Sequence, residues 1–553
     1  MASSMFNPIE FSNVNFNIDN NGIDNNRSAG VLNEPSCPRE PNGTGKGKKR
    51  QPIHQAAQQG NLQMVKLLLK LNASCADVKG SDGVTALILA AQEGNKDIVE
   101  VLIEHGARLD SVINDSQRTA LHQAAQGGHS EVVNILLNHD VLVEVKDNDG
   151  VTPLWSAAQG GYNDIVEVLI HKGASVDVTV GKMRRTPLHQ AAQNGHTEVV
   201  RILLEHSASP DSKDDSGVTP LWSAAQGGHR EIVEMLIKSS ARIDPSATDS
   251  GRTPLHQAAQ NGHVDVVRLL LLHDCDCDPI GDNGLTPLWS AAQQGHAEVV
   301  RILHGSGARL DTAISSDVPR QPIHQAAQGG HFSTVQALLE LGAAAEPESY
   351  CDELPSPFWL AAQGGHVDLC QLLVRYDADI NRPIMPSRRH PVHQAAQDKH
   401  VDVIELLVEL KADLDAREED GWTPMMIASQ QGSLDAVRLL IDGGASVDAE
   451  ENDGATALWL AAQQGHTNIV RLLLDNNARS LPTKANKRLP IHQAAQNGHV
   501  DVVRLLAEKS GEIDLEDGNG VTPLFLASQG KEPRYLRIVE HLADLGAKIM
   551  LDS

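Results

Sequence analysis

The chain repeats itself over most of its length. From residue 51 onward, segments such as RTALHQAAQGGH, VTPLWSAAQGGH and RTPLHQAAQNGH recur at intervals of 33, 34 or 35 residues. A unit of this size is too small to bury a core alone, so it must pack on its neighbours in a stack. The 553 residues therefore predict one repetitive array, rather than the three or four globular domains expected at roughly 150 residues each.

We take the fourth residue of each TPLH-like motif as the anchor of its repeat. The fifteen anchors are His54, Ile88, His122, Trp155, His189, Trp222, His256, Trp289, His324, Trp359, His393, Met426, Trp459, His492 and Phe525. So many near-periodic copies leave little room for chance.

One repeat shows why a pair of helices is expected. In RTPLHQAAQNGHTEVVRILLEHSA, Thr186 suits the cap of a first helix and Pro187 suits its first turn. Gly195 can end that helix in a left-handed conformation. Apolar residues at 199, 200 and 202–204 then form the stripe of a second, antiparallel helix.

The motif T-P-L-H-x-A at about 33 residues resembles the signature of the ankyrin-repeat family. The resemblance covers residues 51–553 and implies an all-α solenoid of about 15 helix-turn-helix repeats. It also implies partner binding along a concave groove and finger-like turns. The last copy carries three inserted residues, as expected of a terminal repeat.

Residues 1–50 differ from the array. They contain ten asparagines, lack helical periodicity and end in GTGKGKKR, which predicts a disordered leader. Six Lys or Arg and five Asp or Glu lie there, so almost all of the net charge of −26 belongs to residues 51–553. Such acidity disfavours nucleic acid as a partner. The basic end is either a weak nuclear-import signal or a plain linker.

Composition limits the cellular compartments and the kinds of chemistry that we expect for this chain. The six cysteines have neither zinc spacing nor the density of a disulfide scaffold, and no signal peptide or long apolar run occurs. We expect a soluble monomer in the cytoplasm, with the nucleus as an alternative. No cofactor is expected, and Cys275 and Cys277 are expected to be free thiols.

Two kinds of repeat alternate, giving a true period of about 67 residues. The residue four before the anchor is arginine in every copy with a His anchor and in no other copy. These arginines are Arg50, Arg118, Arg185, Arg252, Arg320, Arg389 and Arg488. They either bind carboxylates of a partner or pair with the acidic turns of neighbouring repeats, and duplication history alone could also have spread them. In the first case, replacing all seven by Glu would leave melting nearly unchanged and remove the partner.

A glutamine stands four residues after every anchor. The row comprises Gln58, Gln92, Gln126, Gln159, Gln193, Gln226, Gln260, Gln293, Gln328, Gln363, Gln397, Gln430, Gln463, Gln496 and Gln529. These amides either grip the backbone of a partner or are solvated helix formers copied by duplication. The candidate partner-binding residues are the seven arginines and Gln126, Gln159, Gln193, Gln226, Gln260 and Gln293.

The anchors themselves are expected to be structural. By resemblance to the family, the histidines bond to backbone in adjoining turns rather than to a metal, and the tryptophans pack between repeats. No nucleophile elbow, phosphate loop, kinase motif or zinc signature occurs. The sequence thus predicts a non-enzymatic scaffold or adaptor that binds proteins. The alternatives are a polyanion receptor using the arginines and a secreted effector acting in a host cell.

Overall fold

The computed structural model describes residues 50–247, 250–281, 284–313, 320–347 and 354–548. Within them lie 30 α-helices, labelled α2 to α31, one short 3-10 helix and no strand. The predicted all-α fold of about fifteen helix pairs is therefore confirmed. The leader predicted for residues 1–50 lies almost wholly outside the described residues.

The chain divides into two compact units, Met1–Asn283 and Gly284–Ser553. In the first unit the helices are α2 (Pro52–Gln58), α3 (Leu62–Leu71), the 3-10 helix η1 (Ala73–Asp77), α4 (Ala86–Gln92), α5 (Lys96–Glu104), α6 (Ala120–Gly127), α7 (Ser130–Leu137), α8 (Pro153–Gly160), α9 (Asn163–His171), α10 (Pro187–Asn194), α11 (Thr197–Glu205), α12 (Pro220–Gly227), α13 (Arg230–Lys238), α14 (Pro254–Gln260) and α15 (Val264–Leu272).

In the second unit the helices are α16 (Pro287–Gln294), α17 (Ala297–Gly305), α18 (Pro322–Gln328), α19 (Phe332–Glu340), α20 (Pro357–Gln363), α21 (Val367–Arg375), α22 (Pro391–Gln397), α23 (Val401–Glu409), α24 (Pro424–Gln431), α25 (Leu434–Asp442), α26 (Ala457–Gln464), α27 (Thr467–Asp475), α28 (Pro490–Asn497), α29 (Val500–Ser510), α30 (Pro523–Ser528) and α31 (Pro533–Asp544).

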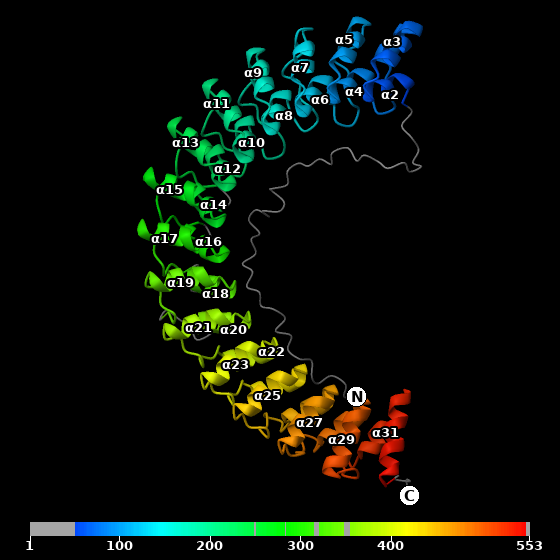
Figure 1. Ribbon diagram of the computed structural model, residues 1–553, viewed down its shortest axis with the longest axis vertical. Coiled ribbons are helices and arrows are strands. Elements are labelled where there is room, and N and C mark those ends of the chain that lie inside the picture. The colour runs from blue at the N-terminus through cyan, green and yellow to red at the C-terminus, as the bar shows by residue number, and fades with distance from the viewer. Residues whose placement is uncertain (1–49, 248–249, 282–283, 314–319, 348–353, 549–553) are drawn as a thin grey trace. The chain divides into compact units, whose positions relative to one another are not determined.

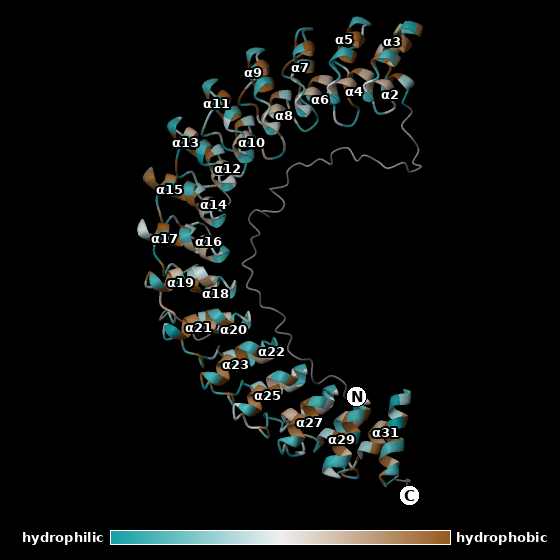
Figure 2. Cartoon of the chain, viewed as in Figure 1, coloured by the Kyte–Doolittle hydropathy of each residue, from teal (hydrophilic) through white to brown (hydrophobic). Residues whose placement is uncertain are grey.

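Within each unit, the helices form two parallel rows. Even-numbered first helices contact the first helices of adjacent repeats, and odd-numbered second helices contact each other in the same way. Figure 1 shows the even-numbered row along the inner side of each unit and the odd-numbered row outside it. Hydrophobic residues run along the packed helices, whereas the turns are hydrophilic (Figure 2).

The helix pair of α10 and α11 forms because of the capping, proline, glycine and apolar residues that its sequence contains. The Thr186 side chain accepts a hydrogen bond from the backbone N–H of His189, and Pro187 occupies the first turn. Gly195 ends α10 with a φ of 79°. Ala191 and Ala192 are completely buried, which allows neighbouring helices to approach closely. Each buried Val or Leu of α11 adds about 1.5–3 kcal/mol of transfer free energy.

A second histidine joins successive repeats. His129, at the start of α7, donates from Nε2 to the backbone carbonyl of Gln92 in the preceding repeat at 2.9 Å. The ring lies over Gly94, where an added Cβ would stand 2.4 Å from Nδ1. The contact therefore requires glycine at this position. Equivalent bonds of 2.8–3.1 Å link His196, His229, His263, His331, His400, His466 and His499 to the repeats before them.

We expect Gly94→Ala to destabilise the first unit more than Gly106→Ala. Both glycines have positive φ, 73° at Gly94 and 82° at Gly106, but no atom lies within 4 Å of a Cβ at Gly106. Backbone strain alone should cost about 1–2 kcal/mol at Gly106, while Gly94→Ala must also displace His129. Urea titration followed by circular dichroism measures both, and equal midpoints would show that the histidine contact contributes little.

Candidate functional site

The histidine anchors are buried and fully bonded to backbone where both partners are described. In His189, Nδ1 accepts from the backbone N–H of Thr186 at 3.2 Å, so the proton lies on Nε2. Nε2 then donates to the carbonyl of Val218 in the next repeat at 3.0 Å. His54, His122, His393 and His492 make the same pair of bonds. The expected backbone role is confirmed for these five.

Burial lowers the pKa of five of the anchor histidines. The pKa falls from 6.5 to about 4 at His189 and to about 3 at His324 and His393, because the charged form loses its hydration. At pH 7 the rings are neutral and suited to the bonds just described. The pKa of His122 and His492 is lowered for the same reason.

The seven arginines and seven of the glutamines lie together. Arg185 donates from Nη1 to Gln193 Oε1 at 2.8 Å and from Nε to Asp214 Oδ2, in the turn of the next repeat, at 3.0 Å. Asp214 Oδ1 accepts from the backbone N–H of Ser216 and Val218, both at 2.9 Å. We call this group, an arginine with the glutamine eight residues later and the acid of the next turn, an arginine triad.

Arginine triads recur with small variations. They comprise Arg118–Gln126–Asp147, Arg389–Gln397–Glu418, Arg488–Gln496–Asp517 and, with a longer ion pair of 3.7 Å, Arg50–Gln58–Asp82. Arg252 and Arg320 bond to Gln260 and Gln328 at 3.0 and 3.2 Å. In the next turn of these two copies, the position of the acid holds Gly281 or Cys351 instead. Cys351 lies outside the described residues.

The arginine side chains therefore do not project freely from the turns into solvent. Only 18% of the Arg185 side chain is exposed and none of the Asp214 side chain. Pairing with the acidic turn of the neighbouring repeat, one of the sequence's alternatives, is what the structure contains. This arrangement argues against the expectation that seven Arg→Glu changes would leave melting intact, because in five of the seven copies the new carboxylate would face the acid of the next turn. The sequence signal that could have revealed this pairing is that the arginine, the glutamine and the acid recur at fixed separations along the chain.

The glutamines of the other repeat type have a different environment. The side-chain amides of Gln159, Gln226 and Gln293 make no hydrogen bond to any described residue, and each residue is partly exposed. Their backbone carbonyls accept the interrepeat histidine bond at 2.9–3.0 Å. In contrast, Gln126 and Gln193 are held by arginine, and Gln260 is buried.

The tryptophan anchors pack between repeats, as expected. Trp155 lies in a cluster with Val151, Val178 and Val180, and the last two belong to the next turn. Trp222, Trp289, Trp359 and Trp459 are also buried, and the indole N–H groups of all five make no hydrogen bond to a residue that the structure describes. Phe525, which no described repeat follows, is 50% exposed. The anchors therefore depend on the next repeat for cover.

The cysteines give no sign of metal or redox chemistry in the described part of the chain. Cys75, Cys275, Cys277 and Cys370 are free. Burial raises the pKa of Cys275 and Cys370 to about 12, so both stay protonated at neutral pH. Among the described residues, no three His, Cys, Asp or Glu side chains are grouped so that they could hold a metal ion. Cys37 and Cys351 lie outside those residues.

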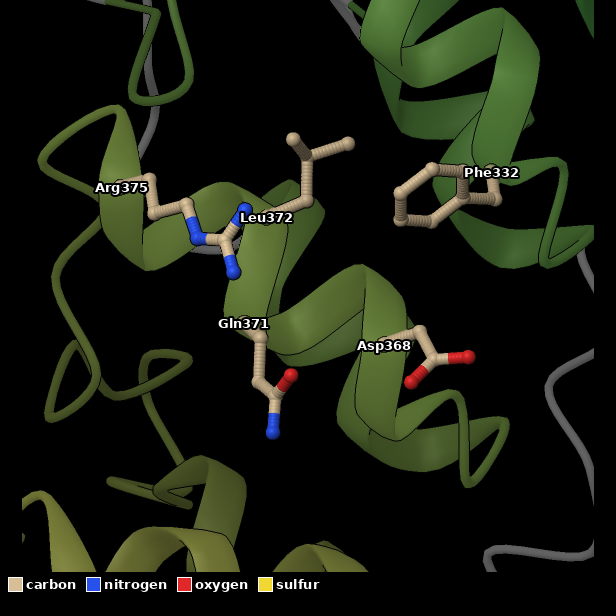
Figure 3. Close-up of a pocket in the computed structure, with 5 residues that line it drawn as sticks. All are labelled: Phe332, Asp368, Gln371, Leu372 and Arg375. Carbon is tan, nitrogen blue, oxygen red and sulfur yellow. The ribbon is translucent and has the colours of Figure 1, made fainter.

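A shallow recess lies between two second helices of the second unit. It is lined by Phe332 of α19 and by Asp368, Gln371, Leu372 and Arg375 of α21, with Phe332 facing Leu372 (Figure 3). Its walls mix one aromatic ring with charged and amide groups and include no Cys, Ser or His. The helices of the described chain are all too short or too polar to span a lipid bilayer.

We expect the array to lose stability on mild acidification. Above pH 6.5 the buried histidines are neutral in both states. Below it the unfolded state binds more protons, so the free energy of unfolding falls as the pH falls towards 4. At pH 5 the loss should be on the order of 2 kcal/mol for His189. Urea midpoints measured between pH 5 and 7 test this expectation. The change His189→Gln should flatten the pH dependence of the midpoint, whereas His139→Gln, at an exposed residue, should not. A flat profile in the unaltered chain would contradict it.

We expect Arg185→Glu to destabilise the array and the adjacent Arg184→Glu to change it little. The first places a carboxylate against buried Asp214 and should cost about 3–5 kcal/mol. Arg184 is 67% exposed and lies 3.9 Å from Asp215, an exposed pair worth about 0–1 kcal/mol. Thermal unfolding followed by circular dichroism compares the two, and equal shifts would show that the triad is energetically neutral.

The comparisons with known proteins agree with this geometry. The family model for ankyrin repeats, which spans three copies, matches residues 30–113, 108–180, 179–249, 243–314, 309–384, 392–483 and 476–553. No curated protein matches the chain. Ankyrin repeats are generally protein–protein interaction modules, and proteins built from them are typically scaffolds rather than enzymes. Helix pairs, bonded TPLH histidines and family matches over nearly the whole array together place this chain in the ankyrin-repeat family.

Proposed function

We propose that the protein is a non-enzymatic scaffold or adaptor that binds protein partners along the first-helix face and adjoining turns of its repeats. The observation that carries the proposal is the row of partly exposed glutamine amides on the first helices, free of bonds to described residues in the apolar-anchor copies. A bound chain can use both the donor and the acceptor of each amide.

Rigidity supports the same proposal. Bonds between repeats hold first helices in place, such as those at 3.0 Å from His189 to Val218 of the next repeat and at 2.9 Å from His196 to the Gln159 carbonyl of the preceding one. A surface held in place before binding loses little conformational entropy when a partner docks. The amides therefore suit recognition of an extended segment of a partner.

Charge favours a protein with basic segments over a polyanion. The chain has a net charge of −26, and its triad arginines are already paired with acids of the chain. A phosphate backbone would meet repulsion, and the triad arginines are not free to offset it. A soluble monomeric protein of the cytoplasm or nucleus remains part of this proposal.

The proposal predicts that partners depend on the free amides. Gln92, Gln159 and Gln226 changed together to Ala should keep the helix content, since Ala favours helices, and should lower capture of the partners retained by the unaltered chain by about tenfold. Quantitative mass spectrometry of proteins retained on the immobilised full chain measures this. Arg201→Ala, on the outer helix α11, is the matched control. Undiminished capture by the triple variant would place the binding surface elsewhere.

A further inference from the structure

One repeat junction departs from the pattern of arginine triads. Four described acids occupy the same position eight residues before an apolar anchor and pair with an arginine of the preceding repeat: Asp147, Asp214, Glu418 and Asp517. Glu451 occupies that position as well, before anchor Trp459. It follows the place where two apolar-anchor copies stand side by side, so its preceding repeat carries Trp422 where the others carry arginine.

Glu451 has the same local setting as the triad acids. Its Oε1 accepts from the backbone N–H of Ala455 and its Oε2 from that of Asp453, both at 2.9 Å. Asp214 is also held by two backbone N–H groups, although both bond to Oδ1 and leave Oδ2 to Arg185. Only 8% of Glu451 is exposed, and no described Lys, Arg or His side chain forms an ion pair with it. The carboxylate is therefore fixed in place and largely removed from water without a cation.

The second acceptor of a triad is also present. Gln430 lies eight residues after Trp422, as Gln397 lies eight residues after Arg389 in the repeat before. There, Arg389 Nη2 donates to Gln397 at 3.4 Å and its Nε lies 3.0 Å from Glu418. Gln430 is partly exposed and its amide makes no hydrogen bond to a described residue. Both oxygen groups that hold a guanidinium in the preceding repeat thus recur at this junction.

Trp422 replaces the arginine with an aromatic ring that is partly exposed. Its backbone carbonyl accepts from His393 Nε2 at 3.1 Å, as that of Val218 does from His189, and Trp422 stands four residues before its anchor, as each triad arginine does. An indole face binds guanidinium groups by cation–π contact, with a gain of about 0.5–2 kcal/mol. The three side chains come from adjacent repeats of the second unit.

We propose that Trp422, Gln430 and Glu451 bind the side chain of an arginine supplied by a partner protein. The guanidinium takes the place that the chain's own arginine has in the triads, bonding Glu451 and Gln430 while it stacks on Trp422. Arginine is favoured over lysine because its planar fork reaches two separate acceptors, as the internal examples do. A net charge of −26 draws a basic segment to this surface. This inference rests on the proposed function and names the chemistry that one of its sites recognises.

A peptide with a single arginine tests the site in the full chain. Saturation-transfer NMR on acetyl-Gly-Arg-Gly-amide should show binding that is about tenfold weaker for the citrulline peptide, which keeps the shape and loses the charge. Glu451→Gln should weaken binding of the arginine peptide by a similar factor. Glu450→Gln is the matched control, because its side chain is 42% exposed and lies outside the group. Equal binding of both peptides, or equal binding by both variants, would overturn the proposal.

Trp422→Arg provides an independent test that does not depend on a loss of folding. It supplies the arginine within the chain, so the urea midpoint should rise while binding of the arginine peptide falls to the citrulline level. A lowered midpoint with undiminished peptide binding would overturn the proposal. If the unaltered chain captures partners and Trp422→Arg captures them equally, this site fails while the scaffold function stands. If the unaltered chain captures no partners, the scaffold function fails. The comparison of the arginine and citrulline peptides then still shows whether this site binds a guanidinium.

Discussion

The structure depends on hydrogen bonds that leave one repeat and end on the backbone of the next. Each described histidine anchor with both bonds uses one nitrogen to cap its own helix and the other to hold a carbonyl in the following turn, as His189 does with Val218. Where a histidine precedes a second helix, it can bond in the opposite direction, to the preceding repeat, as His196 does with Gln159. A helix pair of this size buries too little surface to fold alone, so stability resides in these junctions.

The alternation of two repeat types has a physical meaning at the junctions. A His-anchor repeat supplies the arginine and the imidazole, and the following repeat supplies the acid and the carbonyl that receive them, as in Arg185 and Asp214. The unit of about 67 residues is therefore a donor repeat followed by an acceptor repeat. In five of the seven arginine copies, the basic turn and the acidic turn after it neutralise each other inside the molecule.

This pairing also decides which groups remain for partners. The triad arginines are consumed by internal contacts, which leaves free amides such as Gln159 and Gln226 on the first helices. Where the alternation slips, an acceptor repeat follows another acceptor repeat, and Glu451 is buried without an ion pair to any described residue. A single irregularity in the repeat order thus creates chemistry that the regular junctions do not offer.

The amino-acid sequence by itself determined the period, the helix pairs and their caps, because these depend on residues a few positions apart, such as Thr186, Pro187 and Gly195. It also indicated which anchors would be structural. Only the tertiary structure decided that Arg185 reaches both Gln193 and Asp214, and hence that the arginines and the glutamines of the His-anchor repeats belong to internal contacts. The arginine and its acid are 29 residues apart, and the helices and turn between them set their distance. That distance arises when neighbouring repeats pack, so no local pattern contains it.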